Sequence, residues 1–579
     1  MNIPVQPATQ RERLTIIVTA ALLSILYAVK IHDPDAWWHL ATGRWIAQNG
    51  SIPATDPFSF LAAGETWNYV NWPPDLFYYF AYSVGGFTAL VVSKMLIAAG
   101  LLTAIGAAAR NAGARLSACV SMMVVVGVLS QARFALLRPN AFGGLLLALS
   151  CAVLLHWMQK RDRSLWALPV IAALWMPTHG TAILSVGVAL VAVVAVALDR
   201  NRTGLRTAGF VLGSIVLLLI VLPSGRQIVG VIGQMDQTSN AVAATLEWAR
   251  IDFAAPRTWM PGLTVLIALI GGAWFAWKSR KDEPTNNTWA PLGLACGAAF
   301  LARGYERNLA EALVLAGPAV ALVISEVSKA AEARKLQLLA KAAPLGVALA
   351  LVGGHLAVEP DSALDSRWGF GVDESRYPHD TLATLKHLPP GRTINNFGIG
   401  GYLIWNEIPE GVFCDGRTFA LYTNEIFDNE IMPTMRDEES LEAVADRHDV
   451  TYGLVSTGSL PYRLMMTSGS WTPIFHGEST SLFVRASRQQ VVINSGRLLL
   501  PELRWDDEPG WSEAWYSGVL RNPSGAAYLA RSIAQSNLEA PNNPVLIKVV
   551  PYLNEVAQAV ISRARVYDVA LWPPEDDGE

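Results

Sequence analysis

The sequence predicts a polytopic α-helical membrane protein that ends in an extracytoplasmic α/β domain and a helical tail. Apolar runs dominate residues 1–357, basic residues recur between alternate runs, and the composition becomes polar beyond that point. Of the 579 residues, 52% are hydrophobic and 16% are charged, whereas a typical globular domain has about 25% charged residues. The net charge of −4 provides no basic field that would indicate nucleic-acid binding.

Eleven apolar runs divide the predicted membrane domain, and several are shorter than the roughly 20 residues that span a bilayer. The first run has no small-residue cleavage site before Asp33, so we expect it to remain as an anchor. The runs are Leu14–Ile31, Gly85–Ala108, Leu116–Ala132, Ala141–Trp157, Leu165–Met176, Ala182–Leu198, Gly209–Leu222, Gly262–Trp277, Trp289–Ala302, Leu309–Ile324 and Ala342–His355.

The distribution of basic residues predicts the topology. Cytoplasmic loops carry an excess of Lys and Arg, and here such clusters fall in alternate connections. Arg11 and Arg13 place the N-terminus on the same side, so an odd number of spans leads the C-terminal part outside. The clusters are Arg110 and Arg115; Lys160, Arg161 and Arg163; Arg200, Arg202 and Arg206; Lys278, Arg280 and Lys281; Lys329, Arg334 and Lys335.

The first outer loop, residues 32–84, begins with two carboxylates next to the membrane. Asp33-Pro34 is typical of a helix start, with a capping carboxylate followed by proline at the first helical position. Asp35 then lies in the first turn, and His39 follows one turn later on the same face. Capping by Asp33, interaction of Asp35 with the helix dipole and simple packing of His39 are the structural alternatives to a functional role.

Four arginines and one histidine break the inside bias at the outer ends of the apolar runs. Ionisable residues are costly there and suggest a functional role. The arginines could together bind one anionic group such as a lipid phosphate, because a guanidinium donates two parallel hydrogen bonds to such a group. The alternative is that each arginine side chain only snorkels toward the lipid headgroups. The residues are Arg133, Arg138, Arg303, Arg307 and, in the turn at residues 177–180, His179.

Residues 358–490 are expected to form a small α/β domain, because short strand-like runs alternate with a helix. We expect strands at 393–397, 412–415, 452–456 and 482–485, a glycine turn at 398–401, a helix at 439–448, and a helical extension at 491–579. Asp415-Gly416-Arg417 is either a loop that contacts an acceptor or a tight turn with a salt-bridging arginine. The four cysteines offer neither a disulfide framework nor zinc spacing.

The segment from Asp35 to Arg44 resembles the first outer loop of GT-C-class membrane glycosyltransferases, including lipid A aminoarabinose transferases and protein mannosyltransferases. Those loops carry an acid, an aromatic or polar residue four positions on, and an arginine nine positions on. This chain departs from them at Ala36, where the relatives commonly have a second acid.

A closer resemblance, over most of residues 10–490, is to a bacterial family that shares three motifs. They are Asp33-Pro34-Asp35-Ala36-Trp37-Trp38-His39-Leu40, the segment Ile52-Pro53-Ala54-Thr55-Asp56-Pro57-Phe58-Ser59-Phe60, and an outer domain with Gly400-Gly401-Tyr402-Leu403-Ile404-Trp405 and Asp415-Gly416-Arg417.

The resemblance implies an inverting glycosyltransferase at the outer face of the bacterial inner membrane. Its partners would be a polyprenyl-phosphate or polyprenyl-diphosphate sugar donor and a lipid, glycan or protein acceptor. Asp35 would be the catalytic base, and Asp33 a candidate ligand for a divalent cation, Mg²⁺ or Mn²⁺. Asp56 is either a substrate contact or the cap of another helix start. The substrate-binding candidates are Arg303, Arg307, Arg138, His179, His39 and Asp56.

Two other hypotheses remain open at the level of the sequence: an O-antigen-type polymerase or ligase, and a transporter or non-catalytic assembly protein. An O-antigen-type polymerase or ligase would depend on the outer arginines and tolerate loss of Asp35. A transporter should show paired interrupted helices with charges near the middle of the membrane, whereas these charges lie at the ends of the runs. A non-catalytic assembly protein would tolerate Asp35→Asn with no change in product.

Overall fold

The computed structural model describes residues 8–234, 249–282, 289–358, 368–417, 421–476 and 479–488. The chain forms two compact units. We call residues Met1–Ala54 and Trp67–Asp373 the helical unit, and residues Thr55–Thr66 with the chain from Glu374 onward the sheet unit. The sequence predicts a domain boundary between residues 357 and 358, with the whole first outer loop in the membrane domain. In the structure, Thr55–Thr66 of that loop belongs instead to the sheet unit. The predicted helical extension, 491–579, lies outside the described residues.

The helical unit confirms a polytopic α-helical architecture, but it does not confirm the predicted number of eleven spans. Within the described residues, seven helices are long and apolar enough to cross a membrane, and three shorter apolar helices accompany them. The long helices are α3 (Trp72–Ala112), α6 (Asn140–Lys160), α8 (Leu184–Leu198, preceded by the short turn Gly180–Ile183), α9 (Arg202–Val221), α12 (Trp259–Asp282), α14 (Leu309–Ala333) and α15 (Gln337–Val358). The shorter ones are α4 (Leu116–Leu129), α7 (Ala167–Trp175) and α13 (Ala290–Leu301).

The first two predicted runs differ from the structure at their outer ends. Helix α1 (Gln10–Leu23) ends eight residues before the predicted limit, and the chain continues through a short 3₁₀ turn, Ser24–Tyr27. Helix α3 begins at Trp72 rather than at the predicted Gly85, because its early prolines fit the first helical positions. It bends at Gly85–Gly86, where Gly86 has a φ of 59° that favours glycine.

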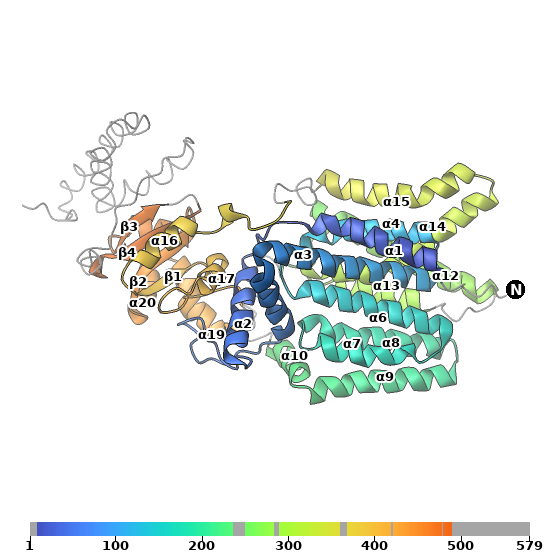
Figure 1. Ribbon diagram of the computed structural model, residues 1–579, viewed down its shortest axis with the longest axis horizontal. Helices are drawn as coiled ribbons and strands as arrows, with labels where there is room; N and C mark the ends of the chain where they lie inside the picture. The colour runs from blue at the N-terminus through green and yellow to red at the C-terminus, as the bar shows by residue number, and fades with distance from the viewer. Residues whose placement is uncertain are drawn as a thin grey trace, which may run out of the picture. The chain divides into compact units, whose positions relative to one another are not determined.

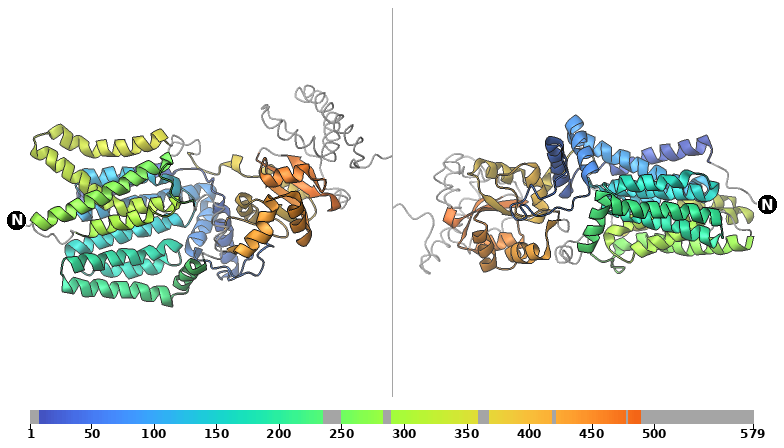
Figure 2. Two further views of the ribbon diagram at one scale, coloured as in Figure 1. Left: turned by 180° about the vertical axis from the view of Figure 1, so that it is seen from behind. Right: turned by 90° about the horizontal axis from the view of Figure 1, so that it is seen from below.

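The long helices of this unit run side by side, and α2 (Asp35–Asn49) lies across one end of the bundle (Figures 1 and 2). The part of α3 before its bend packs along α2. This contact depends on Gly43, because a Cβ there would overlap the backbone carbonyl of Asp75. A short helix, α10 (Pro223–Gln234), is found at the same end of the bundle. The helix that the sequence predicts after Asp33-Pro34 is therefore present in the first outer loop, and the beginning of α3 packs against it.

The sheet unit confirms a small α/β domain. Its described strands pair in the order β1-β2-β4-β3, with β1 parallel to β2 and the other pairs antiparallel. The strands are β1 (Arg392–Asn395), β2 (Val450–Ser456), β3 (Trp471–His476) and β4 (Thr480–Arg485). The helices are α16 (His379–His387), α17 (Phe397–Trp405), α19 (Asn424–Ile426), α20 (Glu438–Arg447) and α21 (Leu460–Thr467).

Three local expectations for the sheet unit need correction. The predicted glycine turn at 398–401 is helical and belongs to α17; Gly400 is needed for close packing, because a Cβ there would overlap the carbonyl of Cys414. The predicted strand at 412–415 is reduced to isolated bridges of Val412 with Ser59 and Thr393. Strand β3 was not expected, since Pro473 inside it argues against a strand.

Candidate active site

Asp33 lies one residue before the N-cap of helix α2, which is Pro34 rather than the predicted Asp33. Its Oδ1 accepts a hydrogen bond from the backbone N–H of Asp35 at 3.1 Å, and its carbonyl accepts from Ala36 N–H at 3.2 Å. The residue is only 3% exposed. A buried carboxylate is costly unless it is paired, so the structure must supply a positive partner.

Arg138, from the segment that leads into α6, is that partner. Its Nε and Nη2 donate to Asp33 Oδ2 and Oδ1 at 2.5 and 2.6 Å, and its Nη1 lies 3.1 Å from Asp35 Oδ2. Tyr78 holds the arginine in place by donating its hydroxyl hydrogen to the Arg138 carbonyl at 3.1 Å. Burial alone would raise the pKa of Asp33, but the charge and hydrogen bonds of Arg138 outweigh it and hold that pKa below its usual value.

The two carboxylates of this site differ in accessibility. The Asp35 side chain is 16% exposed and the Asp33 side chain is 2% exposed. Asp33 uses both oxygens on the Arg138 fork, whereas Asp35 pairs with the same guanidinium through Oδ2. Asp35 is therefore the carboxylate that a substrate can reach, and Asp33 positions the arginine.

His39 is buried on α2 and has a polar partner, so it is not a simple packing residue. Its Nδ1 lies 2.7 Å from Asp75 Oδ1, and Tyr69 donates its hydroxyl hydrogen to Asp75 Oδ2 at 2.5 Å. All three side chains are buried. Removal from solvent and the neighbouring carboxylate of Asp75 raise the pKa of Tyr69 well above its usual value, so the phenol remains a hydrogen-bond donor.

Several of the predicted phosphate ligands gather around His179. Loss of solvent contact and the positive charges of Arg307 and Arg133, together with Arg138, hold the pKa of His179 well below its usual range. The ring is therefore neutral, and its Nδ1 accepts from the backbone N–H of Thr181 at 3.2 Å. The remaining nitrogen, Nε2, then carries the hydrogen and can donate it.

Not every predicted residue joins this group. Arg303 is exposed, and among the described residues the arginines that act on His179 are Arg307, Arg133 and Arg138. Glu311, in the first turn of α14, is instead a member that sequence reasoning missed: it is 4% exposed and interacts electrostatically with Arg133 and Arg307.

Asp33 and Asp35 do not fit a divalent-cation site in their present arrangement. Both are engaged by a single guanidinium, and among the residues that the structure describes no group of three or more His, Cys, Asp or Glu side chains could hold a metal ion. The geometry thus gives the expected metal role of Asp33 no support, and no step of the proposed mechanism passes through a cation.

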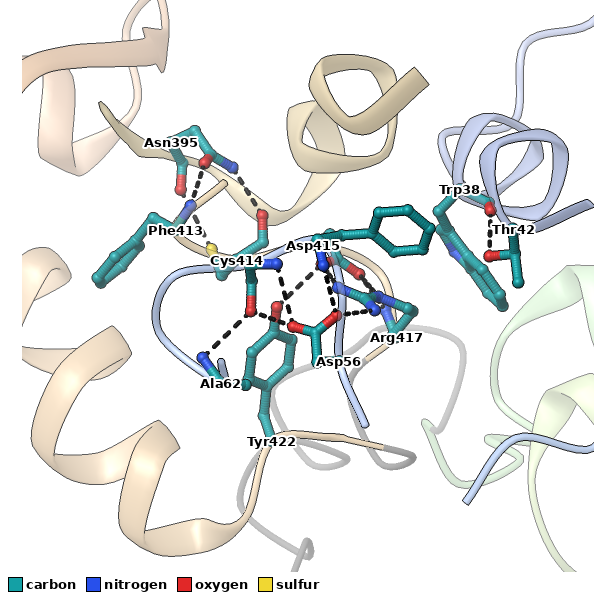
Figure 3. A network of polar contacts seen from close by, with 12 residues as sticks. Trp38, Thr42, Asp56, Ala62, Asn395, Phe413, Cys414, Asp415, Arg417 and Tyr422 are labelled. Atoms are coloured by element: carbon teal, nitrogen blue, oxygen red, sulfur yellow. Dashed lines mark hydrogen bonds and ion pairs between the residues drawn. The ribbon is translucent and has the colours of Figure 1, made fainter. Parts of the chain in front are cut away.

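Asp56 belongs to the sheet unit, where it forms part of a buried polar network (Figure 3). Its Oδ1 lies 2.5 Å from Nη1 of Arg417, whose Nη2 lies 2.7 Å from Asp415 Oδ2. It also accepts hydrogen bonds from the backbone N–H groups of Phe58 and Ser59. The Asp56 and Arg417 side chains are fully buried, so Asp56 is a structural ion-pair partner, and Arg417 is the expected salt-bridging arginine. The helix start predicted at Asp56 is wrong, because residues 57–66 form turns and isolated bridges.

Neither Asp75 nor Tyr69 was identified from the sequence as a polar partner of His39. A signal for Asp75 was present, because Trp72-Pro73-Pro74-Asp75 repeats the arrangement of proline and acid seen at the start of α2. Lys94 was also overlooked: it is 1% exposed in the middle of α3 and donates to the carbonyl of Val29 at 2.5 Å. A single lysine in a long apolar run is the kind of buried ionisable residue that marks a functional region.

The described fold is similar to that of solved oligosaccharyltransferase structures, which confirms the fold expected from the sequence resemblance. No family model and no curated protein matches the sequence. Two matching solved structures are of the archaeal oligosaccharyltransferase AglB from Archaeoglobus fulgidus. The form bound to an inhibitory peptide and a dolichol-phosphate has 12% identity and a TM-score of 0.54, and the match covers 97% of this chain and 86% of that one.

The apo form of the same oligosaccharyltransferase matches with 13% identity and a TM-score of 0.58, over 98% of this chain and 87% of that chain. ArnT from Cupriavidus metallidurans in the apo state has 11% identity and a TM-score of 0.49, over 81% of this chain and 97% of that chain. These likenesses concern the fold.

Proposed function

We propose that this protein is an inverting glycosyltransferase that moves a sugar from a polyprenyl-phosphate or polyprenyl-diphosphate donor to an acceptor at the outer face of a bacterial inner membrane. The observation that carries the proposal is the reachable carboxylate of Asp35, held by Arg138 at the start of α2. The AglB structure with a dolichol-phosphate supports a lipid-phosphate donor for this fold.

In the proposed reaction, Asp35 accepts a hydrogen bond from the acceptor hydroxyl and takes its proton as the oxygen attacks the anomeric carbon. The bond from that carbon to the phosphate oxygen breaks, and its electron pair stays on the phosphate. The Arg138 guanidinium keeps the Asp35 carboxylate oriented, so attack proceeds from a fixed geometry.

The departing phosphate needs donors where its negative charge develops. Arg307, Arg133 and the neutral ring of His179 occupy neighbouring positions that can supply them. Arginine suits phosphate because its planar fork donates two parallel hydrogen bonds. Arg307 is our principal phosphate ligand, whereas exposed Arg303 is a secondary one.

The outward location of the site rests on charge. Connections with Lys and Arg clusters alternate along the chain with connections that have none. The second kind contains Asp33, Arg138, His179 and Arg307. The positive-inside rule assigns those clusters to the cytoplasm, so the site and the sheet unit that follows α15 would be extracytoplasmic.

The proposal is tested by incubating the detergent-solubilised protein with a panel of radiolabelled polyprenyl-phosphate and polyprenyl-diphosphate sugars and native acceptors. Transfer of label from one donor by the wild type supports the proposal and identifies the sugar. A parallel reaction with EDTA shows whether Mg²⁺ or Mn²⁺ takes part. No transfer from any donor by a folded protein would contradict the proposal and favour a polymerase, ligase or assembly role.

A further inference from the structure

Three buried polar side chains form a hydrogen-bonded chain beside the two carboxylates of α2. His39 Nδ1 lies 2.7 Å from Asp75 Oδ1, and the Tyr69 hydroxyl lies 2.5 Å from Asp75 Oδ2. Asp75 has no exposed surface. The proposed reaction does not use Asp75 or Tyr69, although a buried carboxylate is costly to retain.

The hydrogen bonds determine which nitrogen of His39 is free. An ionised Asp75 carboxylate only accepts, so in that state Nδ1 carries the hydrogen of this contact and Nε2 keeps its lone pair. Within the described residues, Nε2 has no hydrogen-bond partner. The indole of Trp38 lies against the imidazole with ring centroids 3.6 Å apart, which limits rotation of the ring.

His39 is close to the carboxylates that the proposed function employs. It follows Asp35 by four residues on α2, which places both on one helix face. A positive charge on its ring would act on Asp33 and on His179. The titratable and charged groups around it are Asp75 from α3, Tyr69 from the segment before α3, Asp33 and Asp35 from the start of α2, Arg138 before α6, and His179 before α8.

We propose that His39, oriented by Asp75 and Tyr69, is the final proton acceptor in the transfer; this inference rests on the proposed function. The acceptor hydroxyl gives its proton to Asp35 while its oxygen bonds to the anomeric carbon and the phosphate leaves with the electron pair. The proton then passes from Asp35 to Nε2 of His39, and the Asp75 carboxylate stabilises the imidazolium. Asp35 is returned to its ionised form, and the imidazolium loses its proton to water after product release.

A structural role for the same three residues makes a different prediction about pH. If His39 accepts the proton, the chemical rate must fall at acidic pH, because a ring that is already protonated cannot accept another proton. Asp75 is then a positioning residue whose charge sets the pH of that fall. If the three residues only stabilise packing, their replacement changes stability without moving the pH dependence.

The test measures single-turnover transfer rates from pH 5 to 9 for the wild type, His39→Gln, Asp75→Asn and a matched control, His156→Gln. We expect His39→Gln to lower the rate about 10²-fold or more and to remove the acidic fall. Asp75→Asn should move the fall to lower pH, because the imidazolium loses its stabilising carboxylate. His156 is exposed and pairs only with exposed Asp162 at 3.3 Å, so its replacement should leave the profile unchanged.

Tyr69→Phe gives a second and opposite readout. Without the hydroxyl donor, more of the Asp75 negative charge acts on His39, so the acidic fall should move to higher pH. The melting temperature and the Kd for undecaprenyl phosphate are measured for each variant. If His39→Gln or Asp75→Asn does not fold, the shift of the acidic fall in Tyr69→Phe provides the test. If the His39, Asp75 and Tyr69 variants are active and their rates fall at the same acidic pH as that of the wild type, the role of His39 is overturned while the proposed function stands. A wild type that transfers no sugar overturns the proposed function and this inference with it.

Discussion

Arg138 binds the carboxylate of Asp33 through two of its nitrogens, with donor–acceptor distances of 2.5 and 2.6 Å. Asp33 is 3% exposed and also accepts a hydrogen bond from the backbone N–H of Asp35, the first residue of α2. The same guanidinium reaches Asp35. One arginine side chain therefore links the start of α2 and both carboxylates to the beginning of α6.

Loss of this arginine should destabilise the helical unit. Arg138→Ala removes the guanidinium that pairs with the buried carboxylate of Asp33, a change that typically costs about 3–5 kcal/mol. We expect a clearly lower melting temperature in detergent, with partial recovery in the double variant Asp33→Asn/Arg138→Met. The control is Arg257→Ala, which breaks an ion pair with Glu306 in which the arginine is 52% exposed; it should cost about 0–1 kcal/mol. Equal losses in both arginine variants would show that the Asp33 pair is not structural.

Acid should weaken the same contact. The pKa of Asp33 is lower in the folded protein than its ordinary value of 3.8, so its contribution to stability is complete above that value. It is lost as the pH falls below 3.8 toward the folded pKa. The melting temperature of the wild type should therefore fall more steeply below about pH 4 than that of Asp33→Asn. Parallel curves for the two proteins would contradict this assignment.

Phosphate binding should distinguish Arg307 from Arg303. Removing a charged hydrogen-bond donor costs about 1.5–3 kcal/mol, so Arg307→Ala should raise the Kd for polyprenyl phosphate about tenfold to hundredfold. Arg303→Ala should raise it less, because Arg303 is exposed and outside the group around His179. Direct binding of labelled undecaprenyl phosphate measures both. A larger effect at Arg303 would reverse the assignment.

Much of the helical unit follows from local patterns in the sequence. Apolar runs predict the long helices, and Asp33-Pro34 predicts the start of α2, because capping and hydrophobic length are properties of neighbouring residues. The phase of the basic clusters also predicts which connections lie together. Residues that approach the bilayer from the same side can therefore be grouped from the order of the apolar runs and basic clusters alone.

The partners within the site could not be predicted in this way. Arg138 and Asp33 are 105 residues apart, and Asp75 is 36 residues from His39. Such pairs depend on how α2 packs on α3 and on where α6 begins, which no local spacing specifies. For the same reason, the sequence motif with Asp56 indicated a possible substrate contact, whereas its partner Arg417 lies 361 residues away in the sheet unit.

The Asp56–Arg417 pair should stabilise the sheet unit. Both side chains are fully buried, and the guanidinium also lies over the ring of Phe58, 5.2 Å from its centroid. Arg417→Ala leaves the Asp56 and Asp415 carboxylates without this partner, so we expect a loss of about 3–5 kcal/mol. Hydrogen exchange in the full-length protein should show faster exchange in segment 55–66 and in β1–β4. The control is Arg447→Ala, whose pair with Glu430 is half exposed on the arginine side; comparable exchange in both variants would contradict the prediction.

The proposed function depends on Asp35 as the base in sugar transfer. The decisive measurement is the single-turnover transfer rate of Asp35→Asn with a saturating polyprenyl-phosphate sugar, beside Asp162→Asn, which alters an exposed aspartate. We expect a loss of about 10²–10⁴-fold for Asp35→Asn, an unchanged melting temperature and donor Kd, and wild-type rates for Asp162→Asn. Transfer by folded Asp35→Asn at the wild-type rate would show that Asp35 is not the catalytic base.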